Sequence, residues 1–152
     1  MYSVDQSSLV SAYGQFFGAW PWDHYATLTF AGHLSDSTCV RHWNDLIDSL
    51  GRLTRGRVAW VRADEQRWSG YASPEIPLHY HALLMYQNVP APGDVADLWR
   101  AMSGDAQVEA YNCGGGAAYY LAKMFPYEDT HYDLGGLERF TCPSGSRRPR
   151  VQ

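Results

Sequence analysis

Residues 78–86 read LHYHALLMY, and this stretch decides the fold. It is rich in residues that favour β-strands, and it is apolar on both faces except at His79 and His81. Residues two apart in a strand point to the same face, about 6.7 Å apart along the strand. We therefore predict a strand over residues 78–86 that presents two imidazoles side by side.

A second strand is predicted just before it, over residues 58–65, which read VAWVRADE. The intervening residues 66–76 (QRWSGYASPEI) contain the Ser, Gly and Pro residues that are typical of a hairpin loop. We expect the two strands to pair as a hairpin, which would bring Glu65 close to His79 or His81.

The remaining elements follow from hydrophobic periodicity. Helices are predicted over residues 5–18, 37–53, 93–102 and 117–124, and further strands over residues 25–30 and 107–111. From the first strand to the last helix, this order follows part of a split β-α-β-β-α-β plan. The predicted fold class is therefore α+β, with a central antiparallel sheet of four to five strands, RRM-like, and helices packed on one face of it.

The length of 152 residues predicts a single domain over residues 1–152, with a core at about 20–126 and a C-terminal extension over 127–152. The tail PSGSRRPRVQ is expected to be mobile. No run of 18 apolar residues and no signal-peptide pattern occurs, so we expect a soluble, cytoplasmic protein without a membrane partner. The spacing of Cys39, Cys113 and Cys142 predicts thiols rather than a disulfide framework.

The formal net charge of −4 argues against a generic nucleic-acid binder. Arginines do cluster locally, and such a cluster is either a solvated surface or a basic face that attracts phosphates. The residues concerned are Arg52, Arg55, Arg57, Arg62 and Arg67, with Arg147, Arg148 and Arg150 in the tail.

The paired histidines are candidate metal ligands, because imidazole is the commonest metal ligand among protein side chains. The alternative is a pair of hydrogen-bonded histidines in a sheet. A third ligand would complete the site: Glu65 is favoured by the hairpin, and Glu75 in the loop is the competing candidate. Two imidazoles and a carboxylate suit a divalent ion such as Mn²⁺ or Mg²⁺.

A candidate nucleophile lies in the segment AAYYLAK at residues 117–123. On a helix, Tyr120 and Lys123 are one turn apart and share a face. A phenol is a weak nucleophile at its ordinary pKa of about 10, and a nearby cation helps it to react. The alternative reading is an aromatic core stripe with a solvated lysine.

Candidate DNA contacts are dispersed along the chain. Thr27 and Thr29 share one face of their strand, where their hydroxyls could touch a DNA backbone, although a plain strand explains them equally well. Arg67 and Trp68 lie in the hairpin loop. Trp68, Tyr71 and Trp22 are candidate platforms for base stacking, with core or loop packing as the alternative.

Taken in chain order, three segments resemble the motifs of rolling-circle replication initiators of the HUH endonuclease superfamily. Residues 26–30 (ATLTF) resemble the first motif, residues 78–84 (LHYHALL) the His-hydrophobic-His motif, and residues 120–123 (YLAK) the YxxK motif. The resemblance spans about residues 25–124. Each motif is short, and their joint order carries the resemblance.

The resemblance implies a site-specific endonuclease that nicks single-stranded DNA at an origin or hairpin through a 5′-phosphotyrosine link. It implies Tyr120 as the nucleophile, Lys123 as its assistant, and a divalent metal held by His79, His81 and Glu65. The tyrosine follows the histidines, which favours the initiator or transposase branch over conjugative relaxases. No GxxxxGK[ST] motif is present, so we expect no fused helicase, and a host helicase is a candidate partner.

Several features leave alternatives open. Tyr119 adjoins Tyr120, and the sequence AAYYLAKM lacks a second tyrosine at YxxxY spacing, which implies one active tyrosine per chain. A single-tyrosine transposase would exchange its tyrosine helix between two chains, whereas an initiator would have His79 and Tyr120 in one chain. Two hypotheses come from other functional classes: a non-catalytic nucleic-acid-binding module and a metal-dependent phosphoester hydrolase.

Overall fold

The computed structural model describes residues 5–65, 78–123 and 132–140. The helices of this part are α1 (Gln6–Gly18), α2 (Asp36–Thr54), α3 (Pro92–Met102) and α4 (Ala117–Ala122). The strands are β1 (His24–Thr29), β2 (Val58–Glu65), β3 (His79–Tyr86), β4 (Ala106–Ala110) and β5 (Tyr132–Gly135), followed by a short 3-10 helix at Leu137–Arg139. The predicted hairpin loop and C-terminal tail lie outside the described residues.

The five strands form one sheet in the order β4-β1-β3-β2-β5, and every pairing is antiparallel. This confirms the predicted α+β class with a central antiparallel sheet. The sequence pattern does not locate the fifth strand, β5, because its four residues, YDLG, are too few to show an alternating pattern. Strand β3 is the middle strand, so its side chains have neighbours from β1 on one side and β2 on the other.

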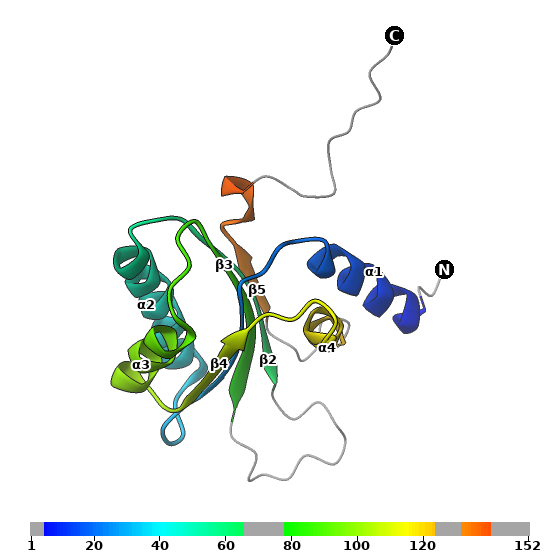
Figure 1. The fold of residues 1–152 in the computed structure, drawn as a ribbon. Helices are drawn as coiled ribbons and strands as arrows, with labels where there is room; N and C mark the ends of the chain where they lie inside the picture. The colour runs from blue at the N-terminus through cyan, green and yellow to red at the C-terminus, as the bar shows by residue number, and fades with distance from the viewer. Residues whose placement is uncertain (1–4, 66–77, 124–131, 141–152) are drawn as a thin grey trace.

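Helices α2 and α3 cover one face of the sheet (Figure 1). The core on this side contains the even-numbered side chains of β1 and β3, packed against Trp43 of α2 and Trp99 of α3. Both tryptophans are fully buried. Tyr80, the residue between the two histidines, points into this core.

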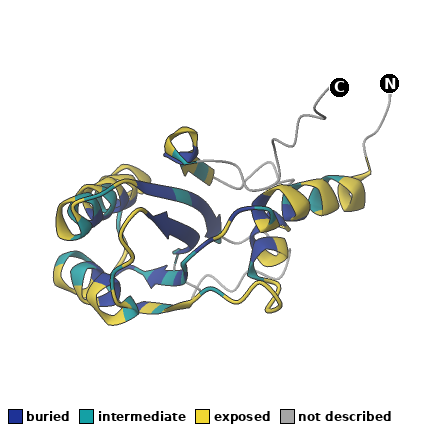
Figure 2. Cartoon of the chain, turned by 45° about the horizontal axis from the view of Figure 1, so that its top comes forward, coloured by how far each residue is buried: buried dark blue, intermediate teal, exposed yellow. Residues whose placement is uncertain are grey.

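Helices α1 and α4 lie on the opposite face of the sheet (Figure 1). There Phe17 and Leu121 pack against Val61 and Leu83 of the sheet. The expectation of helices on one face only was therefore wrong. The physical reason is that β2 and β3 place apolar side chains on both faces of the sheet, so both faces must be covered; Figure 2 shows the sheet buried between helices whose outer sides are exposed.

Two further expectations concern membrane-spanning helices and the cysteines. Among the described residues, no helix has the length and apolar character needed to cross a membrane. Cys39 and Cys113 are free thiols, the first buried and the second exposed, as the sequence predicted. Cys142 lies outside the described residues.

Candidate metal centre

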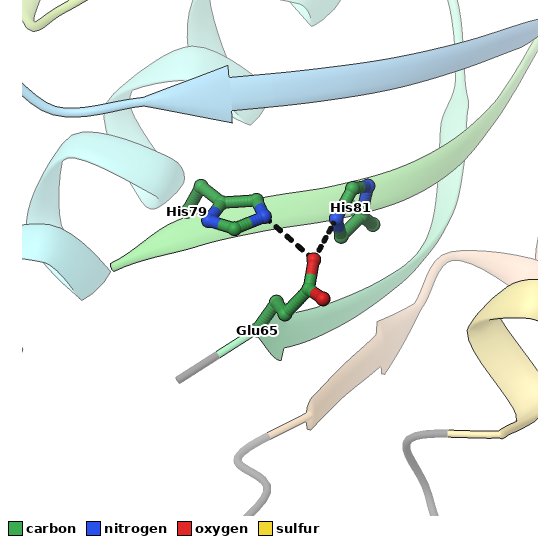
Figure 3. Close-up of side chains that lie close together, drawn as sticks. All are labelled: Glu65, His79 and His81. Atoms are coloured by element: carbon green, nitrogen blue, oxygen red, sulfur yellow. Dashed lines mark hydrogen bonds and ion pairs between the residues drawn. The ribbon is translucent and has the colours of Figure 1, made fainter. Parts of the chain in front are cut away.

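Three candidate ligands come together on two neighbouring strands. Glu65, the last residue of β2, is paired directly with His79, the first residue of β3. Its carboxylate oxygen Oε2 lies 2.6 Å from His79 Nε2 and 2.6 Å from His81 Nε2. Figure 3 shows both imidazoles pointing at this one oxygen. The hairpin thus brings Glu65 to the histidines, as predicted; the competing ligand, Glu75, lies outside the described residues.

The backbone explains why these groups converge. His79 and His81 are two residues apart on β3 and therefore share a face. The antiparallel register places Glu65 opposite His79 and one step diagonally from His81, where a long carboxylate side chain reaches both rings. The two imidazole centroids are 4.9 Å apart.

The donor set fits a divalent cation. The three ligand atoms lie within 4.8 Å of one another, and they comprise two imidazole nitrogens and one carboxylate oxygen. A cation requires neutral imidazole and ionised carboxylate. Burial lowers the pKa of His81, which keeps this ring neutral near pH 7. Burial raises the pKa of Glu65, but the hydrogen bonds and charges of the two histidines outweigh it, so the net pKa is lowered.

A second layer of contacts orients His81. Its Nδ1 lies 2.9 Å from the Tyr25 hydroxyl and 3.4 Å from Thr27 Oγ1, both on β1. The Tyr25 ring also stacks nearly parallel on the His81 ring, at 9° and 6.0 Å between centroids. A partner at Nδ1 matters because it decides which ring nitrogen carries the proton, and Nε2 binds a cation only when the proton is on Nδ1. Burial raises the pKa of Tyr25 to about 12, so its hydroxyl stays protonated near neutral pH.

Tyr25 is not among the site residues that the sequence predicts, although the strand pattern contains a signal for it. Tyr25, Thr27 and Thr29 alternate along β1 and therefore share one face, so the prediction for the two threonines extends to Tyr25. The Thr27 hydroxyl faces His81, while the Thr29 hydroxyl contacts the backbone of Asp105 at 3.2 Å. The DNA contacts suggested for these two threonines remain predictions.

The candidate nucleophile, Tyr120, extends from α4 toward the candidate metal centre. Its hydroxyl lies 3.4 Å from each carboxylate oxygen of Glu65, and its ring meets the His81 ring edge-on at 5.2 Å between centroids. The residue is 40% exposed, so solvent and ligands can reach it. Partial burial and the charge of Glu65 raise the Tyr120 pKa, so the phenol is protonated near neutral pH.

The neighbouring tyrosine, Tyr119, points elsewhere. A methyl group added at Gly14 would overlap its ring, so this ring lies directly against α1. The two tyrosine side chains therefore point in different directions, as expected for consecutive helical residues about 100° apart. Lys123 is the exposed C-cap residue of α4, and no hydrogen bond or ion pair joins its ammonium to Tyr120 in the described structure.

The predicted basic face is only partly present. Arg52, Arg55 and Arg57 are exposed, but Arg62 is 3% exposed and forms an ion pair with Asp64 at 3.1 Å. Its guanidinium lies over the Tyr80 ring, on the α2 side of the sheet. The interpretation of Arg62 as a surface charge was therefore wrong, because the alternation of β2 directs it into the core.

Of the residues proposed to stack on bases, only Trp22 lies in the described part of the chain. Trp22 is 5% exposed and its Nε1 donates to Phe17 O at 2.6 Å, so it is a core residue, in agreement with the alternative reading. Arg67, Trp68 and Tyr71 lie outside the described residues.

Comparison with models of known protein families, with curated proteins and with solved structures finds no match to this chain.

Proposed function

We propose that this protein is a metal-dependent endonuclease that nicks single-stranded DNA and becomes joined to it through Tyr120, in the manner of the HUH replication initiators that its motifs resemble. One observation carries the proposal: the Tyr120 hydroxyl lies 3.4 Å from the carboxylate that contacts both histidines. Residues from β2, β3 and α4 thus converge on one accessible point of the sheet.

The proposed reaction is a transfer of a phosphoryl group to a phenol. The Tyr120 oxygen forms a bond to phosphorus while the bond from phosphorus to the 3′-oxygen breaks. The phenol proton passes to water, because Glu65 must stay ionised to serve as a ligand of the cation. The 3′-oxygen takes a proton from water, which leaves a free 3′-hydroxyl and a 5′-phosphotyrosine.

His79, His81 and Glu65 are the residues that would hold the divalent ion, Mn²⁺ or Mg²⁺. When bound, such an ion supplies positive charge that polarises a phosphate and favours its attack by an oxygen nucleophile. The residues supply the rest: Tyr25 fixes the orientation of His81, and Glu65 faces Tyr120. The raised pKa of Tyr120 makes the positive charge that such an ion would supply necessary, because the phenol is otherwise too weak an acid to react near neutral pH.

The arrangement within one chain favours an initiator over a transposase that exchanges its tyrosine helix. Helix α4 buries Leu121 and Ala122 on the same sheet that carries the histidines, and it packs against α1. Tyr120 and His81 are therefore neighbours without a second chain.

The test is a denaturing gel of the purified protein incubated with labelled single-stranded DNA, in Mn²⁺ and in EDTA. We expect a labelled band at the mass of protein plus DNA, present only with metal and absent in Tyr120→Phe. Metal-dependent cutting without this band would indicate a hydrolase instead. Binding of DNA without any cutting would indicate a non-catalytic binding module.

A further inference from the structure

A hollow of about 350 Å³ adjoins the candidate nucleophile on the side of β4. Tyr25 and Tyr120 line it together with Glu109, Asn112, Gly115 and Gly116. Two of these residues, Tyr25 and Tyr120, also contact the candidate metal centre. A phosphate that reaches Tyr120 therefore has this hollow directly beside it, within the span of a neighbouring nucleotide.

The chemistry of the attack indicates which nucleotide this is. In phosphoryl transfer the attacking and leaving oxygens lie roughly in line, on opposite sides of the phosphorus. The nucleotide that ends in the 3′-oxygen therefore departs on the side away from Tyr120. The nucleotide 3′ of the cut remains attached to the tyrosine, and the hollow lined by Tyr120 is the space beside it.

Charge indicates which part of that nucleotide enters. The Glu109 carboxylate repels phosphate, so a base rather than the DNA backbone is the complementary occupant. Two tyrosine rings line the hollow, and aromatic side chains are the usual platforms for single-stranded bases. Glycines form one wall, so no side chain from them fills the space.

Two polar groups are available to read the edge of the base. Within the described part of the chain, the Glu109 carboxylate has no hydrogen-bond or ion-pair partner. Asn112 Oδ1 accepts from the Gly114 backbone N–H at 3.0 Å, and among the described residues its Nδ2 group has no acceptor, so it can donate to a base. A carboxylate accepts from base amino groups, whereas thymine has no amino group, and its one ring N–H lies between two carbonyl oxygens that repel a carboxylate.

We propose that this hollow binds the base of the nucleotide directly 3′ of the cut, and that Glu109 selects a base with an amino group over thymine. This inference rests on the proposed function, since the hollow matters only if Tyr120 joins to DNA. It adds a specificity residue on β4 that none of the three sequence motifs contains.

The experiment uses a randomised pool of single-stranded DNA in Mn²⁺ and sequences the strands that become attached to the protein. The first nucleotide of each attached strand is the one 3′ of the cut. Wild type should disfavour thymine there, and Glu109→Gln should reduce this discrimination by about tenfold, the equivalent of one good base contact. Gln107→Ala is the matched control, because Gln107 is exposed on the same strand and face but does not line the hollow.

The outcomes separate the two proposals. Attached DNA with no bias at its first nucleotide, or a bias that Glu109→Gln leaves intact, overturns the base pocket while the nicking function stands. A loss of bias in Gln107→Ala equal to that in Glu109→Gln also overturns the role of Glu109. Failure of wild type to join any DNA overturns the proposed function and the pocket with it.

Discussion

Tyr120 and Glu65 are 55 residues apart in the chain, yet the tyrosine hydroxyl lies 3.4 Å from both oxygens of the carboxylate. The same carboxylate lies between His79 and His81. A phenol from a helix and two imidazoles from a strand thus share one acidic partner. This arrangement gives the protein a candidate nucleophile beside a candidate cation site, and it can be tested group by group.

The choice between the adjacent tyrosines is the first test. Tyr120→Phe should abolish the covalent protein–DNA product, because it removes the only hydroxyl of the pair that faces Glu65. Tyr119→Phe should retain most of the product, since that ring lies against α1. Quantifying the labelled band for both variants checks this, and loss of product only in Tyr119→Phe would move the nucleophile to the other residue.

Removal of a ligand should remove the metal. His79→Ala and His81→Ala should each lose Mn²⁺ binding as measured by calorimetry, by about 100-fold or more, because each deletes one of three donors that lie within 4.8 Å. His33→Ala is the control, since His33 is exposed and is not one of the three grouped ligands. Unchanged affinity in both ligand variants would show that the ion binds elsewhere.

Tyr25 should act on the metal through His81. Tyr25→Phe removes the hydroxyl at Nδ1 but keeps the stacked ring, so we expect Mn²⁺ affinity to fall by about 10- to 100-fold. The thermal unfolding temperature in EDTA serves as a check on folding. Tyr111→Phe is the matched control, because Tyr111 packs in the same core without contacting a ligand. Equal affinity in Tyr25→Phe and wild type would contradict the orienting role.

The charge of Glu65 should be measurable at Tyr120. Burial and this carboxylate raise the Tyr120 pKa in the metal-free protein, so Glu65→Gln should lower that pKa toward its ordinary value. Ultraviolet titration of tyrosinate formation in EDTA, with Tyr120→Phe spectra subtracted, measures the shift. A Tyr120 pKa that rises or stays constant in Glu65→Gln would contradict the contact between the two side chains.

Mild acid should destabilise the fold. Burial lowers the pKa of both His24 and His81 below the ordinary value of 6.5, so the unfolded chain binds protons that the folded chain does not. The contribution of each histidine to the free energy of unfolding is complete above about pH 6.5 and is lost as the pH falls through its folded pKa.

Urea unfolding in EDTA should give a lower free energy of unfolding at pH 5 than at pH 7.5. His24→Asn should reduce this difference, because it removes one of the two groups; an unaltered difference would remove His24 from the explanation.

Much of the fold is readable from local pattern. Strand β2 spans the residues predicted for it, and α2 and α3 begin and end within one residue of the predicted bounds. Local signals suffice there because strand and helix periods repeat within a few residues. The short strand β5 lies in a glycine-containing segment whose extended form depends on pairing with β2.

The sequence by itself determined that His79 and His81 share a face, because a strand has a period of two, and that a hairpin would return Glu65 to them. Only the tertiary structure decided that α4 lies on that same face, that Tyr120 rather than Tyr119 meets Glu65, and that Tyr25 orients His81. It also decided that Arg62 is buried in the core. These relationships depend on strand register and on which face each helix covers, and burial of apolar surface from distant segments sets both.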